Sequence, residues 1–204
     1  MSDFLDEKVP PVNPLSMAAI EELGRCFLEY LSSDVLSHPQ PLNVRDLIDQ
    51  RLPEFGIHMS PASREELGDR AGATDPNGDG EIDILVSEDV WDAIEEPVPK
   101  CHFARTTVCH EVAHAVLHVP VLRRRLLMTD ALARIERRSL RAYEDPEWQA
   151  WAFAGAILMP SATLRVLQEG GRRLAPDLVS EIYHVSVPMA KSHLRRLKWP
   201  GTGT

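Results

Sequence analysis

Apolar residues recur at helical spacing over most of the chain, and this pattern predicts a mainly helical protein. The first run predicts a helix over roughly residues 15–32, with apolar positions at Ile20, Leu23, Phe27, Leu28 and Leu31. Asn43 is a suitable N-cap for a second, short helix through Ile48. Residues 1–14 contain three prolines and little apolar periodicity, so we expect a loose N-terminal arm.

Residues 56–88 are the region whose pattern predicts β-structure. Residues 56–59 form a weak strand pattern, and residues 82–86 form a stronger one, entered from a turn at residues 75–80 that is rich in Asp, Asn and Gly. Ser87 then suits the N-cap of a short helix. We therefore expect an α+β fold that is mainly helical and contains one small β-sheet.

The second half of the chain is predicted to be helical. Residues 104–118 form an apolar helix pattern that we expect to stop at Pro120, because proline disrupts a helix interior. Asp145 and Pro146 supply an N-cap and a first-turn proline for the next helix. Two or three short helices then close the chain, among them residues 177–183 and 187–197.

Length and charge limit the functions that fit this chain. Its 204 residues suit one compact domain with extensions. The formal net charge of −9 argues against a protein dominated by contacts with nucleic-acid phosphates, so we do not expect direct DNA binding. One basic helical stretch contains Arg123, Arg124, Arg125, Arg134, Arg137, Arg138 and Arg141. A solvated helix face is the favoured interpretation of this stretch, and contact with an acidic partner is the alternative.

The sequence contains no sign of a membrane segment or an export signal. No apolar run approaches the ~20 residues of a membrane span, and the N-terminal residues lack the basic and apolar regions of a signal peptide. The three cysteines, Cys26, Cys101 and Cys109, form neither a disulfide framework nor a CxxC metal pattern. An odd and sparse cysteine count is typical of a reducing compartment, so we expect a cytoplasmic protein.

Residues 110–114 spell His-Glu-Val-Ala-His, and this H-E-x-x-H pattern predicts a zinc site. Residues four apart lie on one face of a helix, so His110 and His114 can bind one Zn²⁺. Glu111 then lies beside the open position of the metal, where a carboxylate can accept a proton from water acidified by the ion. The alternative is a chance match with ordinary polar contacts. The apolar residues around the motif disfavour that alternative, because unpaired polar groups are costly among them.

A catalytic zinc usually has three protein ligands, so the third must come from outside the motif. His118 is a poor choice, because eight residues of helix separate it from His110 by about 12 Å. Glu147 is better placed, since it shares a helical stripe with two alanines that allow another helix to approach closely. Glu144 and Asp145 remain alternatives.

Two weaker patterns in the sequence resemble a calcium-binding loop and a helix-turn-helix, but we favour a purely structural role for both. Residues 75–82 imitate the start of an EF-hand calcium loop, but Val86 occupies the position of the bidentate glutamate, so we expect a polar turn. The last two predicted helices have a faint likeness to a helix-turn-helix. Because the chain is acidic, we favour packing of these helices against the rest of the protein.

Two segments resemble the signatures of a known family. RTTVCHEVAHAVLH at residues 105–118 resembles R-F-T-x-A-H-E-x-G-H-x-x-L-H, and EWQAWAFAGAILMP at residues 147–160 resembles E-x-x-A-x-x-F-A-x-x-L-L-M-P. These are signatures of the ImmA/IrrE-type zinc metallopeptidases, and the likeness spans roughly residues 15–165. Three positions of the first signature depart from the family pattern: Thr106, Cys109 and Ala113.

The resemblance implies a complete site. In this family the glutamate of the second signature is the third ligand, which implies one Zn²⁺ per chain on His110, His114 and Glu147, with Glu111 as the general base. The residues considered for stabilising the transition state or supporting the ligands are Tyr143, His118 and Arg105.

The resemblance also implies an activity and a kind of substrate. It implies a zinc endopeptidase that cleaves a regulatory protein, such as a helix-turn-helix transcriptional repressor, under stress. The alternative is a non-catalytic, zinc-containing antirepressor or antitoxin partner that acts by binding alone, although such a protein has no evident need for Glu111. The expected organisation is an arm over residues 1–14, a zincin-like minimal metallopeptidase domain over 15–165 and a C-terminal helical extension over 166–204.

Overall fold

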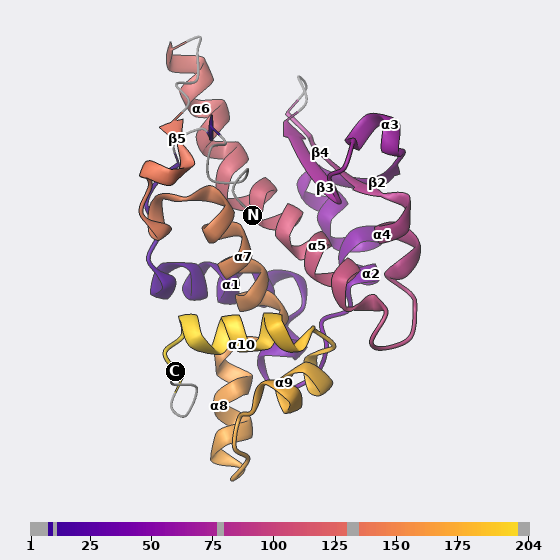
Figure 1. The fold of residues 1–204 in the computed structure, drawn as a ribbon, viewed down its shortest axis with the longest axis vertical. Helices are drawn as coiled ribbons and strands as arrows, with labels where there is room; N and C mark the ends of the chain where they lie inside the picture. The colour runs from indigo at the N-terminus through magenta and orange to yellow at the C-terminus, as the bar shows by residue number, and fades with distance from the viewer. Residues whose placement is uncertain (1–7, 10–11, 77–79, 130–134, 200–204) are drawn as a thin grey trace.

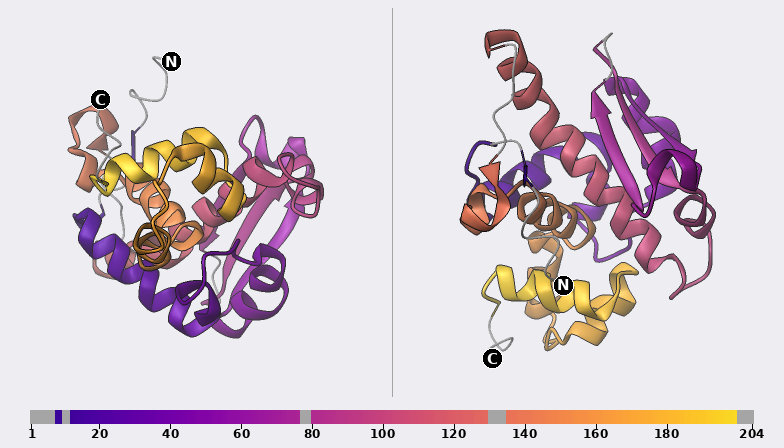
Figure 2. Two further views of the ribbon diagram at one scale, coloured as in Figure 1. Left: turned by 90° about the horizontal axis from the view of Figure 1, so that it is seen from below. Right: turned by 45° about the horizontal axis from the view of Figure 1, so that its top comes forward.

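The protein has the predicted α+β fold, mainly helical with a small sheet. The structure is a computed structural model that describes residues 8–9, 12–76, 80–129 and 135–199. A central helix, α5 (Cys101–Ala113), crosses the molecule (Figure 1). The three-stranded sheet and α4 (Glu88–Ala93) lie on one side of α5, whereas α1 (Met17–Leu31) and α7 (Pro146–Leu158) lie on the other (Figures 1 and 2). Most of α5 is therefore buried.

The sheet contains β2 (Ile57–Ala62), β3 (Gly72–Pro76) and β4 (Ile82–Ser87) in the order β2-β4-β3. β4 runs parallel to β2 and antiparallel to β3, with Ile57 opposite Ile82. Along β4, alternate side chains enter the core, and Val86 is one of them. Val86 therefore offers no ligand to a calcium loop. The predicted strands at 56–59 and 82–86 are confirmed.

The edge strand β3 has no counterpart in the sequence prediction. Its residues, Gly-Ala-Thr-Asp-Pro, carry no alternation of apolar and polar side chains and include turn-forming types. A connection with α3 (Arg64–Leu67), capped by Ser63, leads from β2 towards it. β3 exists because its backbone pairs with β4, and local propensity does not report such pairing.

The N-terminal helices follow the sequence prediction. Ser16 caps α1, and Asn43 caps α2 (Val44–Asp46) by accepting a hydrogen bond from the N–H of Asp46. A 3₁₀ turn (Ser33–Leu36) follows α1, and α2 continues as a π turn (Leu47–Arg51) and a 3₁₀ turn (Leu52–Phe55). Within the predicted N-terminal arm, β1 (Lys8–Val9) pairs with β5 (Ile135–Glu136).

The helix that carries the H-E-x-x-H residues, called the motif helix below, consists of α5 and the π turn that follows it. It continues past Pro120. α5 is followed by one π-helical turn, His114–His118, and then by α6 (Val119–Thr129) in nearly the same direction (Figure 1). In the π turn the N–H of Val119 donates to the carbonyl of His114, five residues earlier. Pro120 is the second residue of α6, directly after this change in hydrogen bonding, where a missing N–H costs little. The predicted helix end at Pro120 is therefore wrong.

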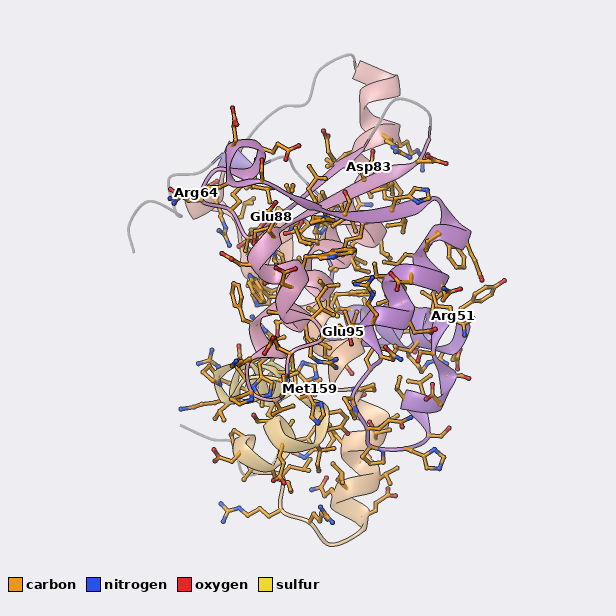
Figure 3. All side chains as sticks on the ribbon, turned by 90° about the vertical axis from the view of Figure 1, so that its right-hand side faces the viewer. Arg51, Arg64, Asp83, Glu88, Glu95 and Met159 are labelled. Atoms are coloured by element: carbon orange, nitrogen blue, oxygen red, sulfur yellow. The ribbon has the colours of Figure 1, made fainter. Side chains whose placement is uncertain are left out.

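Three shorter helices follow α7 in the described chain: α8 (Ser161–Glu169), α9 (Pro176–Tyr183) and α10 (Val187–Arg196). α9 packs on α10, and α10 packs on α7. The buried His193 of α10 donates from Nε2 to the carbonyl of Met159 over 3.1 Å. Figure 3 shows Met159 beside these helices, with Asp83 and Glu88 towards the sheet.

No single helix within the described residues is long and apolar enough to cross a membrane. α7 and α8 together meet that test by length and composition, but a 47° bend separates them. Most residues of α7 are buried within the protein.

Candidate metal centre

Three potential metal ligands converge between the motif helix and α7. His110 Nε2 lies 3.1 Å from His114 Nε2 and 3.2 Å from Glu147 Oε2. His114 Nε2 lies 3.3 Å from Glu147 Oε1. These residues are the one group of three or more His, Cys, Asp and Glu residues, within the described part of the chain, whose ligand atoms all lie within 4.8 Å of one another.

Local sequence explains the position of each group. His110 and His114 share one helix face because they are four residues apart. Asp145 caps α7 by accepting a hydrogen bond from the N–H of Glu147 at 3.1 Å, so Glu147 stands in the first turn of α7. Ala150 and Ala154, further along α7, are fully buried, and α7 packs against α5. The carboxylate of Glu147 therefore faces the two imidazoles.

The geometry and chemistry of these three groups fit a zinc ion. Tetrahedral Zn²⁺ with ligands at about 2.0–2.1 Å holds nitrogen and oxygen donors roughly 3.3 Å apart. The observed separations are 3.1, 3.2 and 3.3 Å. Two imidazoles and one carboxylate also form a donor set of catalytic zinc sites, which keep a fourth position open.

The electrostatics of the cluster favour an anionic Glu147. Burial acts to raise the pKa of its carboxyl group, but hydrogen bonds with His110 and His114 outweigh burial and hold that pKa well below its usual range. Burial acts to lower the pKa of His114, but the hydrogen bond and charge of Glu147 outweigh it, so this pKa is raised. A cation bound here would take the place of the proton that these groups share.

Glu111 lines the same cleft and is held by the edge strand β3. The hydroxyl of Thr74 lies 2.8 Å from Glu111 Oε2 and 3.0 Å from the Glu111 carbonyl oxygen, so it donates to this residue. A Cβ atom on Gly72 would lie 2.7 Å from Glu111 Cγ. Glycine at this position leaves the space that the Glu111 side chain occupies.

His118 lies outside the triangle of ligand atoms but touches it. Its Nδ1 lies 3.0 Å from His114 Nδ1, and its Nε2 lies 3.1 Å from Gln149 Oε1. Burial lowers the pKa of His118 to about 4, so its ring is neutral at neutral pH. The ring of His110 packs against Trp151, with ring centroids 4.3 Å apart.

The structure does not bring Tyr143 or Arg105 into this cleft. The hydroxyl of Tyr143 accepts a hydrogen bond from Arg141 at 2.7 Å. Arg105 is buried and donates to the backbone carbonyls of Leu42 and His184. Both side chains are therefore engaged away from the ligand atoms.

The other acidic residues considered as third ligands are also engaged elsewhere. Glu144 accepts a hydrogen bond from the backbone N–H of Arg141 at 3.0 Å. Asp145 caps α7 and pairs with Arg137 at 3.0 Å. Neither lies in the group of mutually close ligand atoms.

The predicted basic stretch makes local contacts where the structure describes it. Arg123 donates to the backbone carbonyls of Gly80 and Glu81, and Arg137 pairs with Asp145. Outside the described parts lie Arg134, the side chains of Arg125 and Arg138, and Asn77 and Asp79 of the predicted polar turn.

A cleft of about 530 Å³ surrounds the site, and its walls come from β3, the motif helix and α7. Sequence reasoning missed Thr74 and Gln149. No local pattern identifies them, because their partners Glu111 and His118 lie 37 and 31 residues away along the chain.

Comparison with known proteins agrees with this geometry. Residues 104–195, which include the H-E-x-x-H motif and Glu147, match the Peptidase_M78 family, described as the IrrE N-terminal-like domain. A solved structure of a Mycobacterium tuberculosis transcriptional regulator has a similar fold, with a TM-score of 0.53 and 14% identity. The similarity covers 90% of this chain and 48% of that chain, so this chain spans about half of its length. No curated protein gives a significant match. This family match over residues 104–195 confirms the predicted resemblance to the ImmA/IrrE-type proteins.

Proposed function

We propose that this protein is a zinc-dependent endopeptidase. The observation that carries the proposal is the convergence of His110, His114 and Glu147 in the cleft that also contains Glu111. The family match supports peptidase chemistry. His110, His114 and Glu147 would hold the Zn²⁺ ion, which would supply the Lewis acidity that polarises the scissile carbonyl group and makes water more acidic.

Glu111 acts as the proton carrier in this proposal. Its carboxylate accepts a proton from the attacking water and then donates that proton to the leaving amine nitrogen. The Thr74 hydroxyl holds one carboxylate oxygen, so the side chain is oriented before substrate binds. His118 does not serve as a second proton donor, because both of its ring nitrogens are engaged by neighbouring side chains.

The cleft favours an extended peptide as substrate. β3 pairs with β4 on one side, and its residues Gly72, Ala73 and Thr74 line the cleft. The backbone of an edge strand can pair with an extended peptide, which places the peptide beside the ligand atoms. Phe103 and Leu122 add apolar side chains to the walls, so we expect apolar residues near the scissile bond.

We further propose that the substrate is a cytoplasmic regulatory protein, such as a helix-turn-helix repressor. The family resemblance supports this choice, and the fold is similar to that of the Mycobacterium tuberculosis transcriptional regulator. The acidic net charge of −9 favours action on the repressor itself over direct competition for DNA.

The variant Glu111→Gln tests this function, because it keeps the side-chain volume and removes the proton acceptor. We expect at least about a hundredfold lower kcat on a repressor encoded beside this gene, or on a library of unstructured peptides. Zinc content, measured by atomic absorption, should stay at one ion per chain. Repressor inactivation by both proteins without any fragments would replace the peptidase proposal with the antirepressor alternative.

A further inference from the structure

A chain of hydrogen-bonded side chains runs from α7 to one of the proposed ligands. Gln149 Oε1 lies 3.1 Å from His118 Nε2, and His118 Nδ1 lies 3.0 Å from His114 Nδ1. Gln149 is fully buried and His118 is 3% exposed. Because solvent hardly reaches these atoms, each must satisfy its hydrogen bonds within the protein.

The partners of Gln149 determine where the protons lie. Gln149 Nε2 lies 2.9 Å from the carbonyl oxygen of Asn13 and 2.8 Å from that of Tyr143. Carbonyl oxygens only accept, so this atom is the amide nitrogen and the amide oxygen faces His118. An amide oxygen also only accepts, and therefore His118 Nε2 carries a proton.

The proton on His118 Nε2 in turn determines the protonation of His114. A neutral imidazole has one N–H and one lone pair, so His118 Nδ1 presents its lone pair to His114. His114 Nδ1 must then donate a proton to it. The remaining nitrogen of His114, Nε2, carries a lone pair and faces His110 Nε2 and Glu147 Oε1.

We propose that Gln149 and His118 are positioning residues that hold His114 in the tautomer with its Nε2 lone pair directed at the metal. This inference rests on the proposed zinc centre. Partners of this kind fix the ring orientation and tautomer of metal-binding histidines. His110 is held differently: its Nδ1 has no hydrogen-bond partner among the described residues, and its ring packs on Trp151.

Zinc affinity of the full-length chain tests the inference. We would measure it by competition with a chromophoric chelator in wild type, Gln149→Leu, His118→Phe and the double variant. Each single substitution should weaken zinc binding by about 10- to 100-fold. The double variant should lose no more zinc affinity than the weaker-binding single variant, because both residues act on His114 through the same series of hydrogen bonds. Additive losses, or unchanged affinity, would overturn the inference.

Gln149→Glu separates positioning from a purely structural role. It keeps an oxygen acceptor for His118 but loses the N–H donors to Asn13 and Tyr143. We expect this variant and Gln149→Leu, both without zinc, to melt earlier than wild type, while the zinc affinity of Gln149→Glu stays within a few-fold of wild type. Equal losses of zinc affinity in the Glu and Leu variants would assign Gln149 a structural role only.

The variant Gln149→Glu also adds a negative charge near the site. Nitrogen-15 NMR of the histidine rings in wild type and Gln149→Leu provides a readout that does not depend on this charge. In the zinc-free protein at alkaline pH, His114 should carry its proton on Nδ1, and Gln149→Leu should give a mixture of tautomers. The same tautomer in both proteins would contradict the inference. If wild type binds no zinc, the proposed centre fails together with the inference; if wild type and variants bind it equally well, only the inference fails.

Discussion

Glu111, the proposed general base, shows how one side chain depends on a strand distant in sequence. Its carboxylate lies between the motif helix and β3, where Thr74 donates to it and Gly72 leaves space for it. Neither contact requires a charged partner. The strand therefore orients the carboxylate without an ion pair that would compete with its proposed role as a base.

Thr74→Val tests this orientation, because valine keeps the β-branched shape and loses the hydroxyl. A hydrogen bond to a charged group contributes about 1.5–3 kcal/mol, so we expect kcat to fall by roughly tenfold or more. KM and zinc content should change little. Thr74→Ser, which keeps the hydroxyl, is the matched control and should stay near wild type. Full activity of Thr74→Val would show that Glu111 needs no such support.

At the scale of single residues, the sequence is informative where the chemistry is local. Spacing of four residues alone predicts that His110 and His114 share a helix face, and the structure places them 3.1 Å apart at Nε2. Glu147 required the family resemblance to choose it over Glu144 and Asp145. Gln149 was not predicted, because its role depends on contacts with Asn13 and His118, which tertiary packing supplies.

At the scale of elements, the largest error of the sequence prediction was the expected end of the motif helix at Pro120. The rule that proline ends a helix assumes a regular α-helical pattern on both sides of it. Here a π turn at His114–His118 shifts the hydrogen bonding just before Pro120. His114 and His118 are also four residues apart, and their rings lie together as that spacing predicts. A π turn has no simple sequence signature, so the continuation of the helix past Pro120 was not predictable.

The close packing of α1 on α7 gives a test at this scale. A Cβ atom on Gly24 would lie 3.0 Å from the Cβ of Ala156. We expect Gly24→Ala to lower the free energy of unfolding by about 1 kcal/mol, because overpacking outweighs the gain in helix propensity. In the background Ala156→Gly, the same substitution should be neutral or stabilising, because the obstructing methyl group is gone. Urea unfolding measures all four proteins, and the same effect in both backgrounds would contradict close packing.

At the scale of the whole molecule, the fold places the proposed active site between two parts of the chain. The sheet supplies β3 on one side of the motif helix, and α7 supplies Glu147 on the other (Figure 2). The class of fold was predictable from periodicity and turn residues. Packing of the last helices on the rest of the protein was also expected, but the choice of α7 as the partner of α10 was not, because it depends on Gly155, where a Cβ atom would lie 2.5 Å from His193 Nδ1.

We expect His193 to make this docking sensitive to pH. Burial lowers its pKa to about 4, the hydrogen bond to the Met159 carbonyl opposes this effect, and the charge of Arg196 adds to it. Glu21 faces the same ring at 3.8 Å. In the unfolded chain the histidine titrates near pH 6.5. Between pH 6.5 and about 4 the unfolded state therefore binds the extra proton, and folding stability falls as the pH falls.

His193→Gln should remove this part of the pH dependence, because glutamine can donate to the Met159 carbonyl but does not titrate. The lowered pKa corresponds to roughly 3 kcal/mol of stability that wild type loses as the pH falls through this window. Urea unfolding of the zinc-free proteins at several pH values measures the difference between the two curves. The other histidines and Glu21 are present in both proteins, so their titration largely cancels. Parallel curves would show that His193 becomes protonated without disturbing the contact between α10 and α7.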